Sequence, residues 1–179
     1  MGLRPAHTCR DLNKTPWSRF SKKKPKKSFV KSMPHATLHV YNMGTVKADY
    51  DTLVEVSAAA DIQIRDNSLE SGRQAINRHL EKALTVGGFQ MKLLVYPHNV
   101  IRENKMITGA GADRLQKGMR KSFGRATSRA ARIRQGQIVF TVRCRKANIP
   151  VIKEGVKRAQ LKMPGKFVIE VKSLAPKAS

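Results

Sequence analysis

Cysteine is nearly absent from this sequence, and acidic residues are scarce. Its two cysteines, Cys9 and Cys144, lie too far apart for the ligand spacing of a zinc site and provide no disulfide framework, so we expect two reduced thiols. Only 12 of the 179 residues are aspartate or glutamate. The acidic residues between 61 and 81 are explained by helix capping and by i,i+4 pairing. Paired carboxylates for general acid–base catalysis are not evident. We therefore predict no metal, no cofactor and no catalytic residue.

Long hydrophobic runs are missing as well. No apolar run approaches the roughly 20 residues of a membrane-spanning helix, and no signal peptide is visible. We expect no membrane partner and a cytoplasmic location. The five histidines are scattered, with no carboxylate or cysteine at ligand spacing. His98 is the one worth testing because it borders a basic segment, and a packed or RNA-facing histidine is favoured over a catalyst.

Positive charge, in contrast, is abundant. The 36 lysines and arginines give a net charge of +24 and a pI near 10.8. Self-repulsion of this size destabilises a compact chain unless a polyanion neutralises it, and nucleic acid is the commonest polyanion in cells. Segment 46–96 is nearly balanced in charge, so the excess belongs to the amino-terminal residues, a central segment and the carboxy-terminal helix. This distribution is typical of a folded body with basic extensions.

The first 34 residues form one such extension. They are rich in lysine and arginine and are interrupted by Pro5, Pro16 and Pro25, so they cannot bury enough apolar surface to order themselves. We predict an extended basic arm over residues 1–34. Trp17 and Phe20 within it can pack on the body or stack on bases, and packing is the favoured interpretation.

Folded structure is expected over residues 35–173, as a single α+β domain followed by a polar tail over 174–179. Alternating apolar residues predict strands, and two amphipathic segments predict helices that begin near Asn67, with a capping-box-like Glu70, and near Asn148. The fold class is a two-layer sandwich of a mixed or antiparallel sheet with both helices on one face, and no homo-oligomer is expected. The predicted strands lie within 35–44, 52–58, 89–96, 137–145 and 167–171.

A long basic loop, 97–136, is predicted to be inserted between two of these strands. Its glycines disfavour a long helix, and its basic residues far outnumber its acidic ones. We therefore expect the loop to lack regular structure. A partner for such a loop comes from outside the chain and is anionic. The four arginines at its end cannot all serve one internal ion pair, and surrounding phosphate explains them best. They are Arg125, Arg129, Arg132 and Arg134.

The sequence TGAGAD, at 108–113, invites comparison with a phosphate-binding loop. Gly109 and Gly111 allow backbone N–H groups to approach an anion. The third glycine of a dinucleotide fingerprint is missing, however, and no Gly-Lys-Ser/Thr follows. The same glycines suit a loop whose backbone lies close against RNA, where a side chain would obstruct contact.

Several motifs together resemble a known family. They are LRPA at 3–6, the Trp-Ser-Arg cluster at 17–19, SLESGRQAINRHLEK at 68–82, YPHNVIRENKMITGAGADRLQKGMRKSFG at 96–124, and AARIRQGQ ending at Gln137. This set is similar to the universal large-subunit ribosomal proteins of the L-ten-e and L-sixteen family, in its archaeal and eukaryotic branch. The resemblance spans nearly the whole chain.

The resemblance implies a non-enzymatic protein of the large ribosomal subunit. It would bind large-subunit rRNA beside the aminoacyl-tRNA site, direct its central loop toward the peptidyl-transferase centre and tRNA, contact neighbouring ribosomal proteins, and join the subunit late in assembly. Loop contacts to RNA or tRNA would come from Arg102, Lys105, Arg114, Lys117, Arg120 and Lys121. Anchors on rRNA would come from Arg4, Arg10, Arg19, Arg125, Arg129, Arg132 and Arg134.

Two other classes of protein share part of this sequence pattern. A DNA-packaging protein would carry the charge but has no need of a glycine-rich loop between two strands. A nucleotide-dependent RNA-modifying enzyme would carry the basic surface but should show a cofactor motif or an acid–base pair, and neither is evident.

Overall fold

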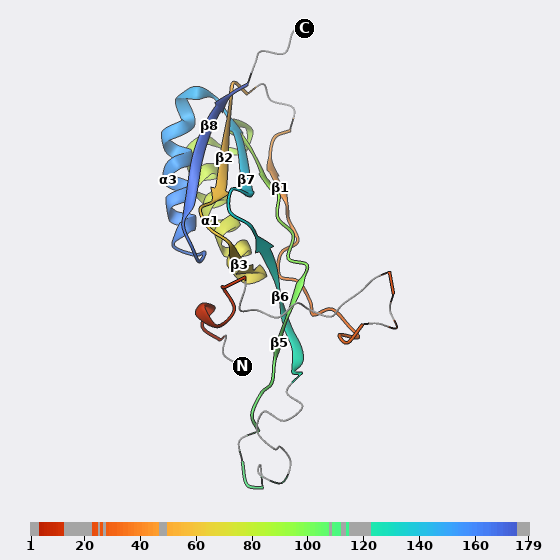
Figure 1. Ribbon diagram of the computed structural model, residues 1–179. Helices are drawn as coiled ribbons and strands as arrows, with labels where there is room; N and C mark the ends of the chain where they lie inside the picture. The colour runs from red at the N-terminus through yellow and green to blue at the C-terminus, as the bar shows by residue number, and fades with distance from the viewer. Residues whose placement is uncertain are drawn as a thin grey trace.

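The computed structural model describes residues 4–12, 23–24, 26, 28–46, 50–107, 109–111, 114 and 123–174. Within them, two α-helices lie beside two antiparallel sheets (Figure 1). The five-stranded sheet has the order β1 (Asn42–Gly44), β4 (Phe89–Leu93), β7 (Ile138–Cys144), β2 (Thr52–Ala58), β8 (Phe167–Ser173). The three-stranded sheet has the order β3 (Ile62–Arg65), β6 (Arg125–Ile133), β5 (Asn99–Glu103). The helices are α1 (Asp66–Leu84) and α3 (Ile149–Gln160), and short 3-10 turns occupy Ala6–Thr8, Val86–Gly88 and Lys146–Asn148.

The larger sheet carries the hydrophobic core on one face. Alternate residues of its strands point the same way, and Val56 of β2, directly opposite Phe140 of β7, is fully buried with it. Leu69 and Ile76 of α1, and Ile152 of α3, close this core from the helical side. The predicted α+β sandwich, with an antiparallel sheet, is therefore confirmed.

The two helices pack side by side on the core face of the sheet (Figure 1). Glycines allow the close approach: a Cβ on Gly72 of α1 would lie 2.8 Å from Sδ of Met163, and a Cβ on Gly155 of α3 would lie 3.2 Å from the His79 ring. These contacts explain why the amphipathic stripes of both helices contain glycine despite its low helix propensity.

The three-stranded sheet continues the larger one. β2 runs on into β3 and β6 runs on into β7, so the same two stretches of chain pair in both sheets. The turn between β6 and β7 is fixed to the start of β3, because Asp61 accepts a hydrogen bond from the backbone N–H of Gln135 at 2.8 Å. The small sheet therefore extends from the body on a paired ribbon (Figure 1).

This small sheet corrects one sequence-based expectation. Segment 97–136 was expected to lack regular structure, yet it contains β5 and β6, which pair with each other. The glycines of the segment lie outside both strands, and Ala130, Ala131 and Ile133 supply apolar side chains that are fully buried. Enough apolar surface is thus available to hold the ribbon in place.

Several elements differ from the prediction in their bounds or caps. The first strand is limited to Asn42–Gly44, although Leu38 upstream is buried. Helix α1 begins at Asp66, so Asn67 is not its cap. The Asp66 carboxylate instead accepts hydrogen bonds from the backbone N–H groups of Asn67 and Thr37, at 2.9 and 3.0 Å. Asn148 does precede α3, but its side chain makes no capping hydrogen bond.

Candidate nucleic-acid interface

The hairpin of β5 and β6 projects from the body and carries most of the predicted site residues that the structure describes (Figure 1). Its two strands pair from Asn99 opposite Ala130 to Glu103 opposite Arg125, with a bulge between Ile101 and Arg102. A bulge strengthens the local twist and redirects the side chains that follow it.

Gly124 determines how the chain re-enters this hairpin. Its φ of +75° is a conformation that side-chain-bearing residues rarely adopt, and a Cβ there would lie 2.8 Å from the carbonyl carbon of Glu103. Glycine therefore allows the backbone before β6 to cross close to the end of β5. This crossing places Phe123 beside Arg102.

Arg102 is held rigidly at this crossing. Its Nη1 donates a hydrogen bond to the carbonyl oxygen of Phe123 at 2.8 Å, and its Cζ lies 3.9 Å from the centroid of the Phe123 ring. The Phe29 ring lies beyond, with its centroid 5.8 Å from that of Phe123. A cation over an aromatic face is attracted by the ring quadrupole, so the guanidinium orientation is fixed from two sides.

Four other predicted cations on or next to the hairpin are exposed. Lys105 and Arg114 lie in the connection between the two strands, Arg125 begins β6 and Arg134 follows it. Glu103, the acid at the end of β5, already accepts a hydrogen bond from Nε of Arg4 at 2.6 Å. The hairpin therefore presents a net positive surface.

Arg129 and Arg132 have a different role from the exposed cations. Arg129 donates from Nε to the carbonyl oxygen of Pro34 at 2.6 Å, and from Nη1 to the Tyr96 hydroxyl at 3.1 Å. Arg132 donates from Nη2 to the carbonyl oxygen of Leu12 at 3.2 Å. Both side chains are half-buried. They tie amino-terminal segments of the chain to opposite faces of β6.

A buried polar network fixes residues 9–10 to the small sheet. The Gln63 backbone N–H donates to the carbonyl oxygen of Arg10 at 2.7 Å, and its Nε2 donates to that of Cys9 at 2.8 Å. Asn99 Nδ2 donates to Gln63 Oε1 at 2.7 Å. Arg10 and Arg4 are thereby brought alongside the hairpin. Sequence analysis did not identify Gln63 or Asn99, because isolated neutral polar residues carry no pattern.

Some predicted residues lie outside the part of the chain that the structure describes. These are Arg19, Lys117, Arg120 and Lys121, together with Trp17 and Phe20. Their roles stay predictions. The described members of the set, in contrast, gather on or against a single small sheet, although they are far apart in sequence.

Tyr41, which stacks on Tyr96 beside Arg129, has a raised pKa. The rings of Tyr41 and Tyr96 stack with centroids 6.0 Å apart. Burial, reinforced by the neighbouring Tyr96 and opposed by the Arg129 charge, raises the pKa of Tyr41. Tyr41 therefore stays neutral near pH 7 and acts as an aromatic surface rather than as an acid or base.

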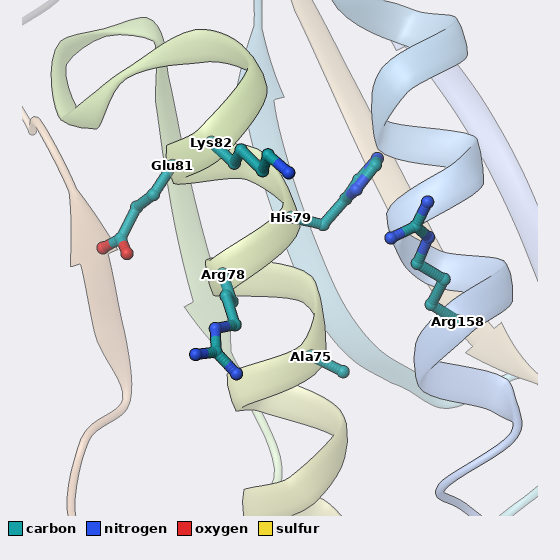
Figure 2. A pocket seen from close by; sticks show the side chains of 6 residues that line it. All are labelled: Ala75, Arg78, His79, Glu81, Lys82 and Arg158. Atoms are coloured by element: carbon teal, nitrogen blue, oxygen red, sulfur yellow. The ribbon is translucent and has the colours of Figure 1, made fainter.

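A second basic surface lies between the helices. A groove there is lined by side chains of both α1 and α3, and Figure 2 shows Lys82, His79 and Arg158 along the gap while Glu81 points to the other side of α1. Glu154 partly neutralises it, since Arg158 Nη2 lies 2.6 Å from Glu154 Oε1 and His79 Nε2 lies 3.8 Å from its Oε2. No sequence-predicted site residue lines this groove.

The described residues offer no group of three or more His, Cys, Asp and Glu side chains arranged to hold a metal ion. None of the described helices is both long and apolar enough to cross a membrane.

Comparison with known proteins gives a consistent result. Residues 18–170 match the family described as ribosomal protein L16p/L10e. A relative from Methanococcus aeolicus is 38% identical over 96% of this chain and 95% of its own length. A relative from Staphylothermus marinus is 38% identical over 98% of this chain and 97% of its own length. A third relative, from Halorubrum lacusprofundi, is 39% identical over 91% of this chain and 90% of its own length. All three carry the name large ribosomal subunit protein uL16.

Proposed function

The chain belongs to the ribosomal protein L16p/L10e family, and on this basis we propose that its β5–β6 hairpin binds large-subunit rRNA beside the aminoacyl-tRNA site. The chain is a structural constituent of the large ribosomal subunit and not an enzyme. Its location is the ribosome, with rRNA and neighbouring ribosomal proteins as partners. The connection between the two strands, 104–124, points toward the peptidyl-transferase centre and tRNA, and the protein joins the subunit late in assembly.

One observation carries this proposal: the exposed cations collect on a narrow ribbon that extends from the body (Figure 1). Lys105, Arg114, Arg125 and Arg134 are exposed, and Glu103 at the end of β5 is already engaged by Arg4. A projecting ribbon of this kind gives RNA access from several sides. Phosphate contacts dominate the affinity of such surfaces.

The amino-terminal cations extend the same surface. Gln63 holds the backbone of residues 9–10 against β3, and Arg132 holds Leu12. Arg4 and Arg10 of the arm are consequently presented next to the hairpin. We assign them as rRNA anchors, while Arg129 and Arg132 act by fixing the neighbouring segments. The arm 1–34, the domain 35–173 and the tail 174–179 are the organisation that we propose for the chain.

Sedimentation of a cell extract tests the proposal. The tagged protein should run with large ribosomal subunits and with assembled ribosomes on a sucrose gradient, and it should leave them at high salt. Sedimentation with DNA instead would favour a DNA-packaging protein. A free pool at the top of the gradient, without subunit association, would favour an RNA-modifying enzyme that acts transiently.

A further inference from the structure

Exposed aromatic side chains are confined to one region of the described structure. The sequence has few aromatic residues, and three of them, Phe89, Phe140 and Phe167, are buried in the core. The exposed ones are Phe29, Tyr96 and Phe123, at 60%, 51% and 39% exposure. All three adjoin the hairpin that carries the exposed cations.

Phe29, Arg102 and Phe123 pack together there and form the Phe29–Arg102–Phe123 cluster. The Phe123 ring has Arg102 over its face, with Cζ 3.9 Å from the ring centroid, and it meets the Phe29 ring at an interplanar angle of 42°. The hydrogen bond from Arg102 to the Phe123 carbonyl keeps the guanidinium plane in place. Aromatic and guanidinium planes are the two protein groups that stack on unpaired bases.

Hydrophobic packing alone explains this cluster poorly. Neighbouring Val30 is only 5% exposed, and Arg129 donates a hydrogen bond to Pro34, so buried contacts of this segment are made by other residues as well. Phe29 and Phe123 nevertheless keep much of their surface in solvent on a strongly cationic element. A ligand that covers them has a flat apolar face and carries negative charge, and an RNA nucleotide combines both.

We propose that the Phe29–Arg102–Phe123 cluster stacks on an unpaired RNA base at the end of the strand pair away from the body, where β5 ends and the chain re-enters β6. This inference rests on the proposed binding of rRNA and specifies which feature of the RNA is recognised there. The exposed cations around it contact phosphate, which every RNA strand offers. The cluster selects positions where a base is free to leave its helix, because a base inside a duplex has both faces covered.

Two synthetic strands separate the base from its phosphate. One is a short oligoribonucleotide of adenosine, and the other is a ribose-phosphate strand of equal length without bases. Both have the same charge, so phosphate contacts contribute equally to their affinities. The wild-type chain should bind the adenosine strand about tenfold or more tightly than the base-free strand, since one stacked base is worth roughly that factor.

The test variant is the double substitution Phe29→Leu and Phe123→Leu, which keeps apolar bulk and removes the rings. Its affinity for the base-free strand should equal that of the wild type, while its preference for the adenosine strand should fall to about twofold or less. The matched control is Leu161→Ala, an apolar side chain that is 85% exposed on a different part of the chain. A second variant, Arg102→Lys, keeps the positive charge but lacks the planar guanidinium group. It should also lower the preference for the adenosine strand over the base-free strand.

A preference that survives in both the double variant and Arg102→Lys, with thermal unfolding unchanged, overturns the inference. A wild-type chain that binds the two strands equally, with affinity that still falls steeply with salt, also overturns it and leaves the proposed rRNA binding intact. Binding of neither strand overturns the proposed function and this inference together. The two failures are therefore distinguishable.

Discussion

Asn99 of β5 donates a hydrogen bond from Nδ2 to Oε1 of Gln63 in β3, at 2.7 Å, and both side chains are almost completely buried. The two strands are not neighbours, because β6 lies between them. The bond therefore crosses over β6 and links the outer strands of the small sheet. Since Gln63 also donates to Cys9, one glutamine connects the amino-terminal segment to the hairpin.

Replacing Gln63 with methionine should destabilise the chain by about 2 kcal/mol or more. The substitution keeps the side chain's length but removes a hydrogen bond from each of two buried groups, Asn99 Nδ2 and the Cys9 carbonyl, and each loss costs about 1–3 kcal/mol. Urea unfolding monitored by circular dichroism gives the free energy. The control, Gln74→Met at an exposed site of α1, should change it by less than about 0.5 kcal/mol. Equal effects of the two substitutions would mean that the network is not a stabilising one.

Replacing Gly124 with alanine should disrupt the hairpin where β5 ends and the chain re-enters β6. The new Cβ would meet the Glu103 carbonyl carbon at 2.8 Å, and the φ of +75° adds strain. Gly136 is a control for the backbone strain alone, because its φ is +76° but a Cβ there would meet nothing within 4 Å. We expect Gly136→Ala to cost about 1–2 kcal/mol and Gly124→Ala distinctly more. Unfolding free energies that are equal for the two variants would show that the close contact relaxes without cost.

Glu70 should make stability depend on pH in the acid range. Hydrogen bonds from Arg73 are the chief reason that the pKa of Glu70 is lowered, with the Gln74 hydrogen bond and the charges of Arg73 and His39 acting in the same direction and burial opposing them. The unfolded chain therefore takes up the proton first, near its ordinary pKa of about 4.3. The stabilisation is fully present above that pH and is lost as pH falls through the folded pKa.

The substitution Glu70→Gln should remove this pH dependence. The difference in unfolding free energy between the wild type and this variant should be largest near neutral pH and should shrink as the pH falls below about 4.3. Glu81→Gln is the matched control, because Glu81 is an exposed acid on the same helix. A difference for Glu70→Gln that stays constant from neutral to acid pH would contradict the assignment.

The sequence predicts the larger sheet well and the smaller one poorly, for a physical reason. Strand β2 was predicted with its observed bounds because Val54 and Val56 alternate with residues on the other face. In β6 both faces are covered: Ala131 and Ile133 belong to the core cluster, whereas Arg132 is bonded to the amino-terminal segment. The resulting pattern of arginine and alanine does not alternate in hydrophobicity, so periodicity cannot identify it.

The candidate site, too, could be predicted from the sequence only in part. Composition located the cations, because a run of bases with few acids is visible in the sequence alone. It could not separate Arg125, which is exposed, from Arg129, whose guanidinium is bonded to Pro34 and Tyr96. That difference depends on contacts between residues 33 and 95 positions apart. The pairing of Phe29 with Phe123 is hidden from sequence patterns for the same reason.

Neutralising the exposed cations of the hairpin should flatten the salt dependence of RNA binding. Each phosphate contact contributes about 0.9 to the log–log slope on a duplex, so replacing Lys105, Arg114, Arg125 and Arg134 with glutamine should reduce the slope by up to about 3.6. Fluorescence anisotropy with a duplex RNA, at several salt concentrations, measures it. The folded body should be preserved, because all four side chains are exposed.

The matched control places the same four losses of charge on the helices. Arg78, Lys82, Lys153 and Lys157 are exposed on α1 and α3, and the variant with glutamine at these positions has the same net charge as the hairpin variant. A general polyanion effect would flatten both slopes equally, whereas a localised interface flattens only that of the hairpin variant. If the helix variant shows the larger change, the RNA lies on the groove between α1 and α3, and the assignment of the hairpin as the interface is wrong.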